Sequence, residues 1–288
     1  MPVPATSGSP AHECAGRFFF IGEWTNRSVD PMTGTVYLVG AGPGAPDLLT
    51  LRAARLLARA DIVFHDALVH PATVALAESA QLVAVGKRCG KYSTAQQFIN
   101  KRLVDAAGVH RIVVRLKGGD PMLFGRAQEE IAALEAAGIA CEVVPGVTAA
   151  LAAAAELKTS LTHRGNARSI AFATPRVGDG ENPSAWADGI IHADAGAIYM
   201  GAGQAAAIAA TLLAAGKPAS LPVAVIENAS LPGVRIRYTT LRDLPALAES
   251  EVTGPVLILL GPQFTSRNQK DVGVAAKRIC TVLRTAAG

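Results

Sequence analysis

The chain has 288 residues, of which 50% are hydrophobic and 17% are charged, and its formal net charge is +4. This length gives one large domain or two of ordinary size, with enough apolar residues for a substantial core. The modest positive charge and the scarcity of aromatic residues disfavour a nucleic-acid-binding protein, in which a dense basic stripe is typical, and favour an anionic small-molecule ligand.

The cysteines and the hydrophobic runs indicate the compartment. Cys14, Cys89, Cys141 and Cys280 lie far apart and form no CxxC pair. This spacing argues against a zinc site or a disulfide framework and for a reducing cytoplasm. The apolar run at residues 17–22 is too short to span a membrane, and no signal-peptide pattern is present. We therefore expect a cytoplasmic protein without a metal ion or a membrane anchor.

The first half of the chain alternates between strand and helix patterns. Residues 1–33 are rich in Pro, Ser, Thr and Gly, which predicts a flexible N-terminal extension. Short apolar runs then predict strands at 36–40, 61–64, 82–85, 111–116 and 141–145, and helical patterns lie at 51–60, 94–108, 125–138 and 146–157. Apolar strands alternating with helices predict a mostly parallel five-stranded sheet that is covered on both faces.

A polar segment, TSLTHRGNARS, interrupts this alternation and predicts a domain boundary. Further strands are predicted at 169–174, 197–201, 222–227, 234–240 and 255–261. The third and fourth of these are joined by a connection too short for a helical crossover, so we expect them to be antiparallel. The predicted organisation is an N-terminal α/β domain at 34–158, a C-terminal α/β domain with a mixed sheet at 159–264, and a tail at 265–288.

A glycine-rich loop follows the first strand. Gly40, Gly42 and Ala45 satisfy the pattern G-x-G-x-x-[GA], which is typical of a dinucleotide-binding Rossmann unit. Pro43 lies inside this pattern, and the helix is predicted to begin only near Leu51, too late for its N-terminus to hold a pyrophosphate at the glycines. Two interpretations of this loop stay open, the NAD site of an oxidoreductase and an ordinary tight turn. A site for another adenine-containing cofactor fits the loop better.

Polar residues follow the second and fourth strands. Asp66 ends the second strand, and the turn at residues 118–121, Gly-Gly-Asp-Pro, follows the fourth. Ligand sites in open α/β sheets gather at this edge, and adjacent glycines let the backbone approach a ligand closely. Asp66 is a candidate general base, with capping of the next helix as the alternative. We expect His65 and His70 to have surface or packing roles rather than to bind a metal ion.

Three further positions have two interpretations each. Lys87, Arg88 and Lys91 follow the third strand, either as a solvated charge run or as part of an anion site at the same sheet edge. Thr148 opens a helix of small residues, either as its cap or as a neighbour of the ligand. Met200 ends a strand of the second half, where core packing is the alternative to a ligand contact.

Taken in order, several motifs closely resemble the tetrapyrrole methylase family, nearest the branch that methylates uroporphyrinogen III. They are VGAGPGAPDLLTLRA, DALV, VGKR, VRLKGGDPMLFGR, VPGVTAA, LTHR, YMG and AVIEN. Each motif is modest alone, but the ordered set across residues 34–262 is highly specific. The resemblance implies two α/β domains with S-adenosylmethionine in the cleft between them, usually in a homodimer.

The resemblance also implies an activity and its residues. The expected reaction is C-methylation of uroporphyrinogen III at C2 and then C7, giving precorrin-1 and precorrin-2 for siroheme, cobalamin or heme d1, with S-adenosylhomocysteine as by-product. Asp66 matches the position proposed as proton acceptor, and Lys87 matches that of the proton donor. The implied cofactor contacts are Pro43, Gly118, Gly119, Asp120, Leu123, Thr148, Ala149, Met200 and Ala229. The cations that we expect to face the carboxylates of the substrate are Arg115, Lys117, Arg126, His163 and Arg164.

The sequence departs from the family at a few positions. Ala45 stands where Asp is frequent, Ala229 where Gly is frequent, residues 173–180 replace a common threonine-glycine-histidine turn, and LKTS precedes LTHR without the usual glycine. No departure removes a proposed catalytic group. Residues 1–33 are shorter than the dehydrogenase/ferrochelatase module of some relatives, so we expect the methylase alone. The rival functions are a sister methylase acting on a later corrin intermediate or on diphthamide, a non-catalytic tetrapyrrole-binding protein, and the NAD-dependent oxidoreductase.

Overall fold

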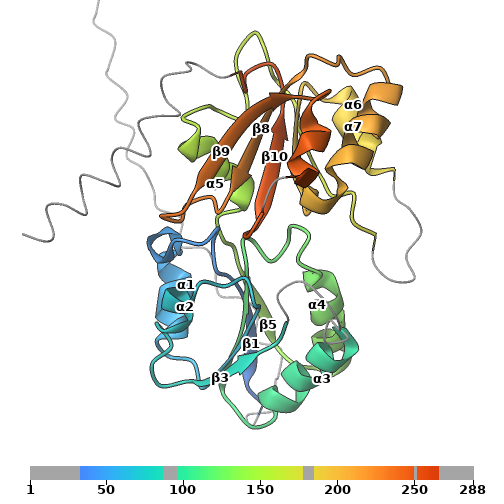
Figure 1. Ribbon diagram of the computed structural model, residues 1–288. Coiled ribbons are helices and arrows are strands. Elements are labelled where there is room, and N and C mark those ends of the chain that lie inside the picture. The colour runs from blue at the N-terminus through green and yellow to red at the C-terminus, as the bar shows by residue number, and fades with distance from the viewer. Residues whose placement is uncertain (1–32, 87–95, 178–184, 250–251, 266–288) are drawn as a thin grey trace, which may run out of the picture.

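The computed structural model describes residues 33–86, 96–177, 185–249 and 252–265. These residues form two α/β units, each built on a five-stranded sheet, with one unit above the other in Figure 1. Each strand predicted from the sequence is present within two residues of its expected ends. None of the described helices has the length and hydropathy of a membrane span.

The first sheet is entirely parallel, with the strand order β3-β2-β4-β1-β5. Its strands are β1 (Thr35–Gly40), β2 (Ile62–His65), β3 (Gln81–Ala84), β4 (Ile112–Lys117) and β5 (Cys141–Val144). This order differs from the 3-2-1-4-5-6 order of a Rossmann domain. The parallel five-stranded sheet expected from the sequence is thus confirmed, and the dinucleotide-binding topology is absent from this unit.

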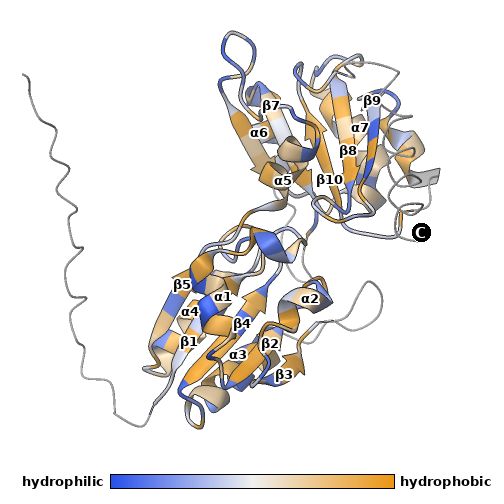
Figure 2. Cartoon of the chain, turned by 90° about the vertical axis from the view of Figure 1, so that its left-hand side faces the viewer, coloured by the Kyte–Doolittle hydropathy of each residue, from blue (hydrophilic) through white to orange (hydrophobic). Residues whose placement is uncertain are grey.

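Helices cover both faces of this sheet, as its apolar strands require. They are α1 (Leu51–Leu57) and α2 (Pro71–Val74) on one face, and α3 (Gln96–Ala107) and α4 (Ala127–Ala136) on the other. Successive side chains of a strand point to opposite faces, so Leu38 packs with α3 and α4 while Val39 packs with α1. Strands β1, β2 and β4 are mostly hydrophobic along their length (Figure 2).

The second sheet is mixed, with the order β6-β7-β10-β8-β9. Its strands are β6 (Ile170–Ala173), β7 (Ala195–Tyr199), β8 (Pro222–Glu227), β9 (Arg235–Thr240) and β10 (Val256–Leu260). β6 and β7 are parallel, and the remaining pairs are antiparallel. The antiparallel pairing of β8 with β9, expected from their short connection, is therefore confirmed. Helices α6 (Trp186–His192) and α7 (Ala205–Ala214) pack on one face.

Helix α5 (Ala149–Glu156) packs on the other face of the second sheet. Its residues Ala150 and Ala153 are fully buried there, beside Ala224 of β8. The expected boundary after residue 158 placed this helix with the first unit, whereas its packing associates it with the second. The sequence pattern also does not predict α2, α6 or α7, because short or alanine-rich helices carry little periodic signal.

Candidate functional site

The loops that follow β1, β4 and β5 are bound to one another by backbone contacts. The Gly119 amide donates to the Gly42 carbonyl at 2.8 Å, and the Gly42 amide donates to the Gly119 carbonyl at 3.2 Å. Gly40 and Gly146 approach so closely that a Cβ on Gly40 would lie 2.6 Å from the Gly146 Cα. Glycine is therefore required for these loops to meet.

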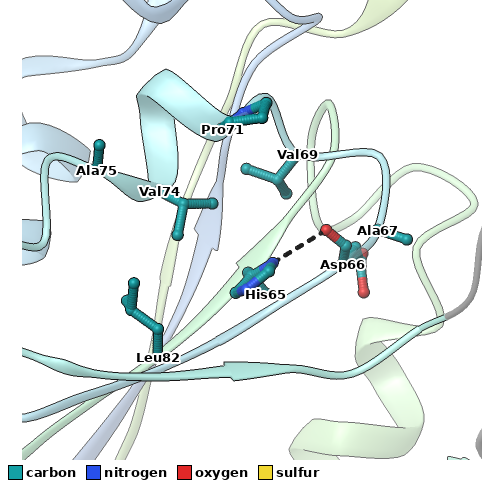
Figure 3. A pocket seen from close by; sticks show the side chains of 8 residues that line it. All are labelled: His65, Asp66, Ala67, Val69, Pro71, Val74, Ala75 and Leu82. Atoms are coloured by element: carbon teal, nitrogen blue, oxygen red, sulfur yellow. Dashed lines mark hydrogen bonds between the residues drawn. The ribbon is translucent and has the colours of Figure 1, made fainter.

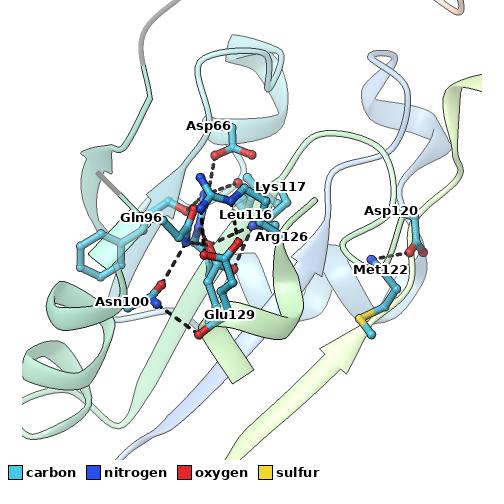
Figure 4. Close-up of polar contacts among 12 residues, drawn as sticks. Asp66, Gln96, Asn100, Leu116, Lys117, Asp120, Met122, Arg126 and Glu129 are labelled. Atoms are coloured by element: carbon cyan, nitrogen blue, oxygen red, sulfur yellow. Dashed lines mark hydrogen bonds and ion pairs between the residues drawn. The ribbon is translucent and has the colours of Figure 1, made fainter. Parts of the chain in front are cut away.

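Asp120 fixes the turn after β4. One carboxylate oxygen accepts from the Gly146 amide at 2.9 Å. The other accepts from the Met122 amide at 2.8 Å (Figure 4). Each oxygen of the carboxylate that we expected to serve the cofactor thus already accepts a backbone amide. Gly119, beside it, has φ +68°, and nothing lies within 4 Å of the place where its Cβ would be. The turn therefore presents bare backbone to open space.

Tyr199 joins the second sheet to these loops. Its hydroxyl lies 2.7 Å from Oγ1 of Thr148 and accepts from the Ala150 amide at 3.2 Å. Thr148 is the N-cap residue of α5 by position, but its side chain makes no capping hydrogen bond, so the capping interpretation is wrong and the ligand contact stays a prediction. Sequence reasoning missed Tyr199; the available signal was a tyrosine at the carboxyl end of a strand, next to Met200.

A second contact between the two units involves the loop after β8. The Ala45 amide donates to Oγ of Ser230 at 3.1 Å, and a Cβ on Gly44 would lie 2.9 Å from the side chain of Leu231. Ala229, next to Ser230, is buried. The glycine-rich loop of the first unit therefore packs against the second unit.

The structure brings the nine expected cofactor positions to this junction. All lie in or beside the connected segments: Pro43 in the β1 loop, Gly118, Gly119, Asp120 and Leu123 after β4, Thr148 and Ala149 at the start of α5, Met200 after β7, and Ala229 after β8. Helix α1 begins at Leu51, where Oγ1 of its N-cap Thr50 accepts from Ala53, so its N-terminus is separated from the glycines by Pro46–Leu48. Helix α1 therefore does not place its N-terminus at the glycines, as a pyrophosphate site would require.

Several apolar side chains at the junction are exposed. Leu68, Met122 and Met200 are 65%, 56% and 44% exposed. Phe124 is 38% exposed and its ring centroid lies 5.1 Å from that of Tyr199. Exposed apolar side chains beside bare backbone suit a ligand that has flat apolar parts and polar groups together.

Asp66 belongs to a network of four charged side chains. Its Oδ1 lies 2.5 Å from Nη2 of Arg115. Nε of Arg115 donates to Oε1 of Glu130 at 3.0 Å, and Nζ of Lys117 lies 2.9 Å from each Glu130 oxygen. Figure 4 shows Asp66 and Lys117 within this set of contacts. Two cations and two anions therefore balance at the carboxyl ends of β2 and β4.

The network corrects the expectation that Arg115 and Lys117 lie on an open cationic rim. They are 2% and 3% exposed, and Glu130 is fully buried. Sequence reasoning missed Glu130, although its spacing from Ala127 and Leu134 places it on the buried stripe of α4.

The network also shifts the pKa values of its cations. Burial lowers the pKa of Arg115, but the charges of Asp66 and Glu130 outweigh burial and raise it. Burial and the charge of Arg115 lower the pKa of Lys117, and Glu130 compensates only in part. Arg115 is therefore the permanent cation of the network.

Asp66 does not cap the following helix. The N-cap of α2 is His70, whose Nδ1 accepts from the Ala72 amide at 3.2 Å. A pocket of about 340 Å³ lies beside Asp66, lined by His65, Asp66, Ala67, Val69, Pro71, Val74, Ala75 and Leu82. In Figure 3 the Asp66 carboxylate points away from the apolar side chains that line the rest of this pocket.

Two other expected site residues, Arg126 and Lys87, are close in sequence to strands that end at the junction. Arg126 is exposed and pairs with Glu129, with Nε to Oε1 at 2.6 Å and Nη2 to Oε2 at 2.8 Å. Lys87, the expected proton donor, lies outside the described residues.

His163 and Arg164 lie at the opposite end of the second sheet. Their exposed turn is closed by backbone bonds of 2.7 and 2.8 Å between His163 and Ala167. The amide of Arg168 donates to Asp194, which precedes β7, whereas Tyr199 ends β7 at the junction. Figure 1 shows this yellow-green turn at the top of the molecule. At about 3.3 Å per strand residue, roughly 16 Å of β7 separates the turn from the junction.

Comparisons with known proteins agree with this fold. The family model described as Tetrapyrrole (Corrin/Porphyrin) Methylases matches residues 35–245. A siroheme synthase from Azotobacter vinelandii is 46% identical over 238 residues, which are 82% of this chain and 51% of that protein. A crystal structure of a uroporphyrin-III C-methyl transferase from Thermus thermophilus, complexed with S-adenyl homocysteine, has a TM-score of 0.71 and 40% identity, covering 80% of this chain and 98% of that one. A cobalt precorrin-4 methyltransferase has a TM-score of 0.69 and 27% identity, covering 80% and 96%.

The chain spans about half the length of the curated relatives it matches. The structural match confirms the expected two-sheet α/β fold, and the family model covers most of both units. The chain therefore belongs to the tetrapyrrole (corrin/porphyrin) methylase family.

Proposed function

We propose that the chain methylates uroporphyrinogen III at C2 and C7 with S-adenosylmethionine, giving precorrin-2 through precorrin-1. The observation that carries the proposal is the junction itself, where bare glycine backbone lies at the same sheet edge as the Asp66 carboxylate. Similarity to the Thermus thermophilus methyltransferase, which was crystallised with S-adenyl homocysteine, supports the choice of cofactor. Similarity to siroheme synthases supports the choice of substrate and a place in siroheme synthesis.

The residues at the junction fit an adenosyl cofactor. The open space at Gly119 admits a ligand next to the backbone, and the exposed side chain of Met200 offers apolar contact. Pro43, Leu123, Thr148, Ala149 and Ala229 complete the proposed contacts, and the carboxylate of Asp120 keeps the turn in shape. S-adenosylmethionine, when bound, supplies an electrophilic methyl group.

The chain would contribute positioning and one proton acceptor. Once a ring carbon of the substrate has gained a methyl group, the substrate must lose a proton from another position of the macrocycle to restore conjugation. The Asp66 side chain is 32% exposed, so its carboxylate is accessible while Arg115 holds Oδ1. Asp66 is the proposed acceptor and Lys87 the proposed donor, and a general base of this kind contributes about 10²–10⁴-fold. Alignment of the reactants supplies much of the remaining rate.

The remaining cations are proposed to bind substrate carboxylates. Arg126 lies after the Gly-Gly-Asp turn, where it can exchange Glu129 for a substrate carboxylate. His163 and Arg164 lie too far from Asp66 to serve the same site in one chain. We therefore propose a homodimer in which the turn of one chain reaches the site of its partner.

The test is anaerobic incubation of the protein with uroporphyrinogen III and S-adenosylmethionine, with the product followed by mass. We expect a gain of two methyl groups, which is lost in Asp66→Asn while S-adenosylhomocysteine still binds. Binding without methylation of this substrate would move the assignment to a sister methylase acting on a later corrin intermediate. Absence of S-adenosylhomocysteine binding would contradict the proposed cofactor.

A further inference from the structure

We infer that Glu130 is a positioning residue, which holds Arg115 and, through Arg115, the carboxylate of Asp66. The inference rests on the proposed role of Asp66. Glu130 lies in the middle of α4 and does not contact Asp66 directly; the guanidinium of Arg115 lies between them.

The guanidinium is held on three sides. Nε donates to Glu130 at 3.0 Å and Nη2 to Asp66 at 2.5 Å. Nη1 donates to the carbonyls of Leu116 at 3.2 Å and Phe64 at 3.5 Å. Because the guanidinium is planar and rigid, the direction of its Nε bond fixes the direction in which Nη2 points. A displacement of the Glu130 carboxylate is therefore transmitted to Asp66.

Glu130 is itself held in place. Nε2 of Gln96 donates to its Oε1 at 3.0 Å, and Lys117 bonds both of its oxygens at 2.9 Å. The side chain is fully buried, and its conformation is fixed by three donors. Asp66, by contrast, is 32% exposed in a loop, so its orientation depends on Arg115.

Charge balance alone is the competing explanation. Apolar side chains of similar volume often replace a buried ion network without loss of stability, so such a network is weak evidence for a stabilising role. Lys117 and Glu130 could nevertheless serve only to neutralise each other and Arg115. The two explanations predict different kcat values for a variant that keeps the negative charge of Glu130 but shortens its side chain.

Glu130→Asp is that variant, because it keeps the charge and withdraws the carboxylate by one methylene. We expect its kcat to fall about tenfold or more, with KM and the affinity for S-adenosylhomocysteine changed about twofold or less. Glu135→Asp, on the exposed face of the same helix, controls for the loss of a methylene in α4. Wild-type kcat in Glu130→Asp would overturn the inference and leave charge balance as the explanation.

A double-mutant cycle tests whether Glu130 acts through Arg115. In an Arg115→Lys background, which lacks the rigid fork, Glu130→Asp should lower kcat by no more than about twofold further. If the two substitutions instead lower kcat by independent factors that multiply in the double variant, Glu130 does not act through Arg115 and the inference is overturned.

A crystal structure of Glu130→Asp gives a readout that does not depend on the substrate. We expect the contact between Arg115 and Asp66 to be lost or to adopt a second geometry. An unchanged contact would overturn the inference even if the wild-type protein methylates uroporphyrinogen III. A displaced contact in a protein that fails to methylate this substrate would instead support positioning and reject the proposed function.

Discussion

The hydroxyl of Tyr199 lies 2.7 Å from the hydroxyl of Thr148 and thereby joins the last residue of β7 to the first turn of α5. The same ring packs against Phe124, which belongs to the loop after β4. Burial raises the pKa of the Tyr199 hydroxyl, although its bonds to Thr148 and Ala150 oppose this effect. The phenol therefore stays protonated at neutral pH and links the two units at the proposed cofactor site.

Tyr199→Phe should lower the free energy of unfolding by about 1 kcal/mol, because it removes the hydrogen bonds of the hydroxyl but keeps the ring packing. Thr148→Val removes the other partner and should have a similar effect. The double variant should be less destabilised than the sum of the two single variants, since both remove the same bond. Urea denaturation measures all three, and full additivity would show that the two hydroxyls do not interact in solution.

Gly119→Arg should abolish binding of S-adenosylhomocysteine, because its side chain would occupy the open space beside the backbone of the turn. Gly138 is a matched control: its φ is +69° against +68° for Gly119, and nothing lies within 4 Å of its Cβ position either. Both substitutions should cost about 1 kcal/mol of stability, from the left-handed backbone. Calorimetric titration should show that Gly138→Arg binds S-adenosylhomocysteine normally. An equal loss of binding in both variants would mean that backbone strain, and not the filled space beside Gly119, is the cause.

Glu227 should make the stability of the second unit pH-dependent. Burial alone would raise the pKa of its carboxyl group, but Arg235 and the amides of Thr253 and Gly254 lower it to about 2, from an ordinary value of 4.5. The ionised form therefore stabilises the fold above about pH 4.5, and this contribution is lost as the pH falls from about 4.5 toward about 2.

Glu227→Gln should accordingly be about 2 kcal/mol less stable than the wild type near neutral pH, with the gap closing as the pH falls below about 4. Denaturant unfolding at a series of pH values measures the gap. A gap that stays constant from neutral pH to about pH 3 would mean that ionisation of Glu227 is not its source.

Arg164 provides a test of the proposed homodimer. Asp66→Asn and Arg164→Ala should each be inactive as pure proteins. Co-expressed with two different tags, they should recover about a quarter of the wild-type activity, because half of the dimers are mixed and each mixed dimer contains one intact site. No recovery in purified mixed dimers would show that both residues act within one chain, and activity of pure Arg164→Ala would show that Arg164 does not serve the site.

Much of the junction could be predicted from local sequence. The Gly-Gly-Asp turn, the late start of α1 and the ends of the strands depend on neighbouring residues, and the structure has them where the pattern indicated. The roles of charged residues could not be predicted in this way. Arg115 and Asp66 are 49 residues apart, and only the parallel pairing of β2 with β4 brings them into contact.

The sequence by itself therefore determined the alternation of strands and helices and the glycine positions at the loops, because apolar periodicity and backbone freedom act over short stretches of chain. The tertiary structure alone decided which charges are buried and paired. Arg115 and Lys117 look like ligand-binding cations in the sequence, but burial requires a counter-charge, and α4 supplies Glu130. It also decided that His163 and Arg164 lie far from Asp66, since the direction of β7 carries them to the opposite end of the sheet.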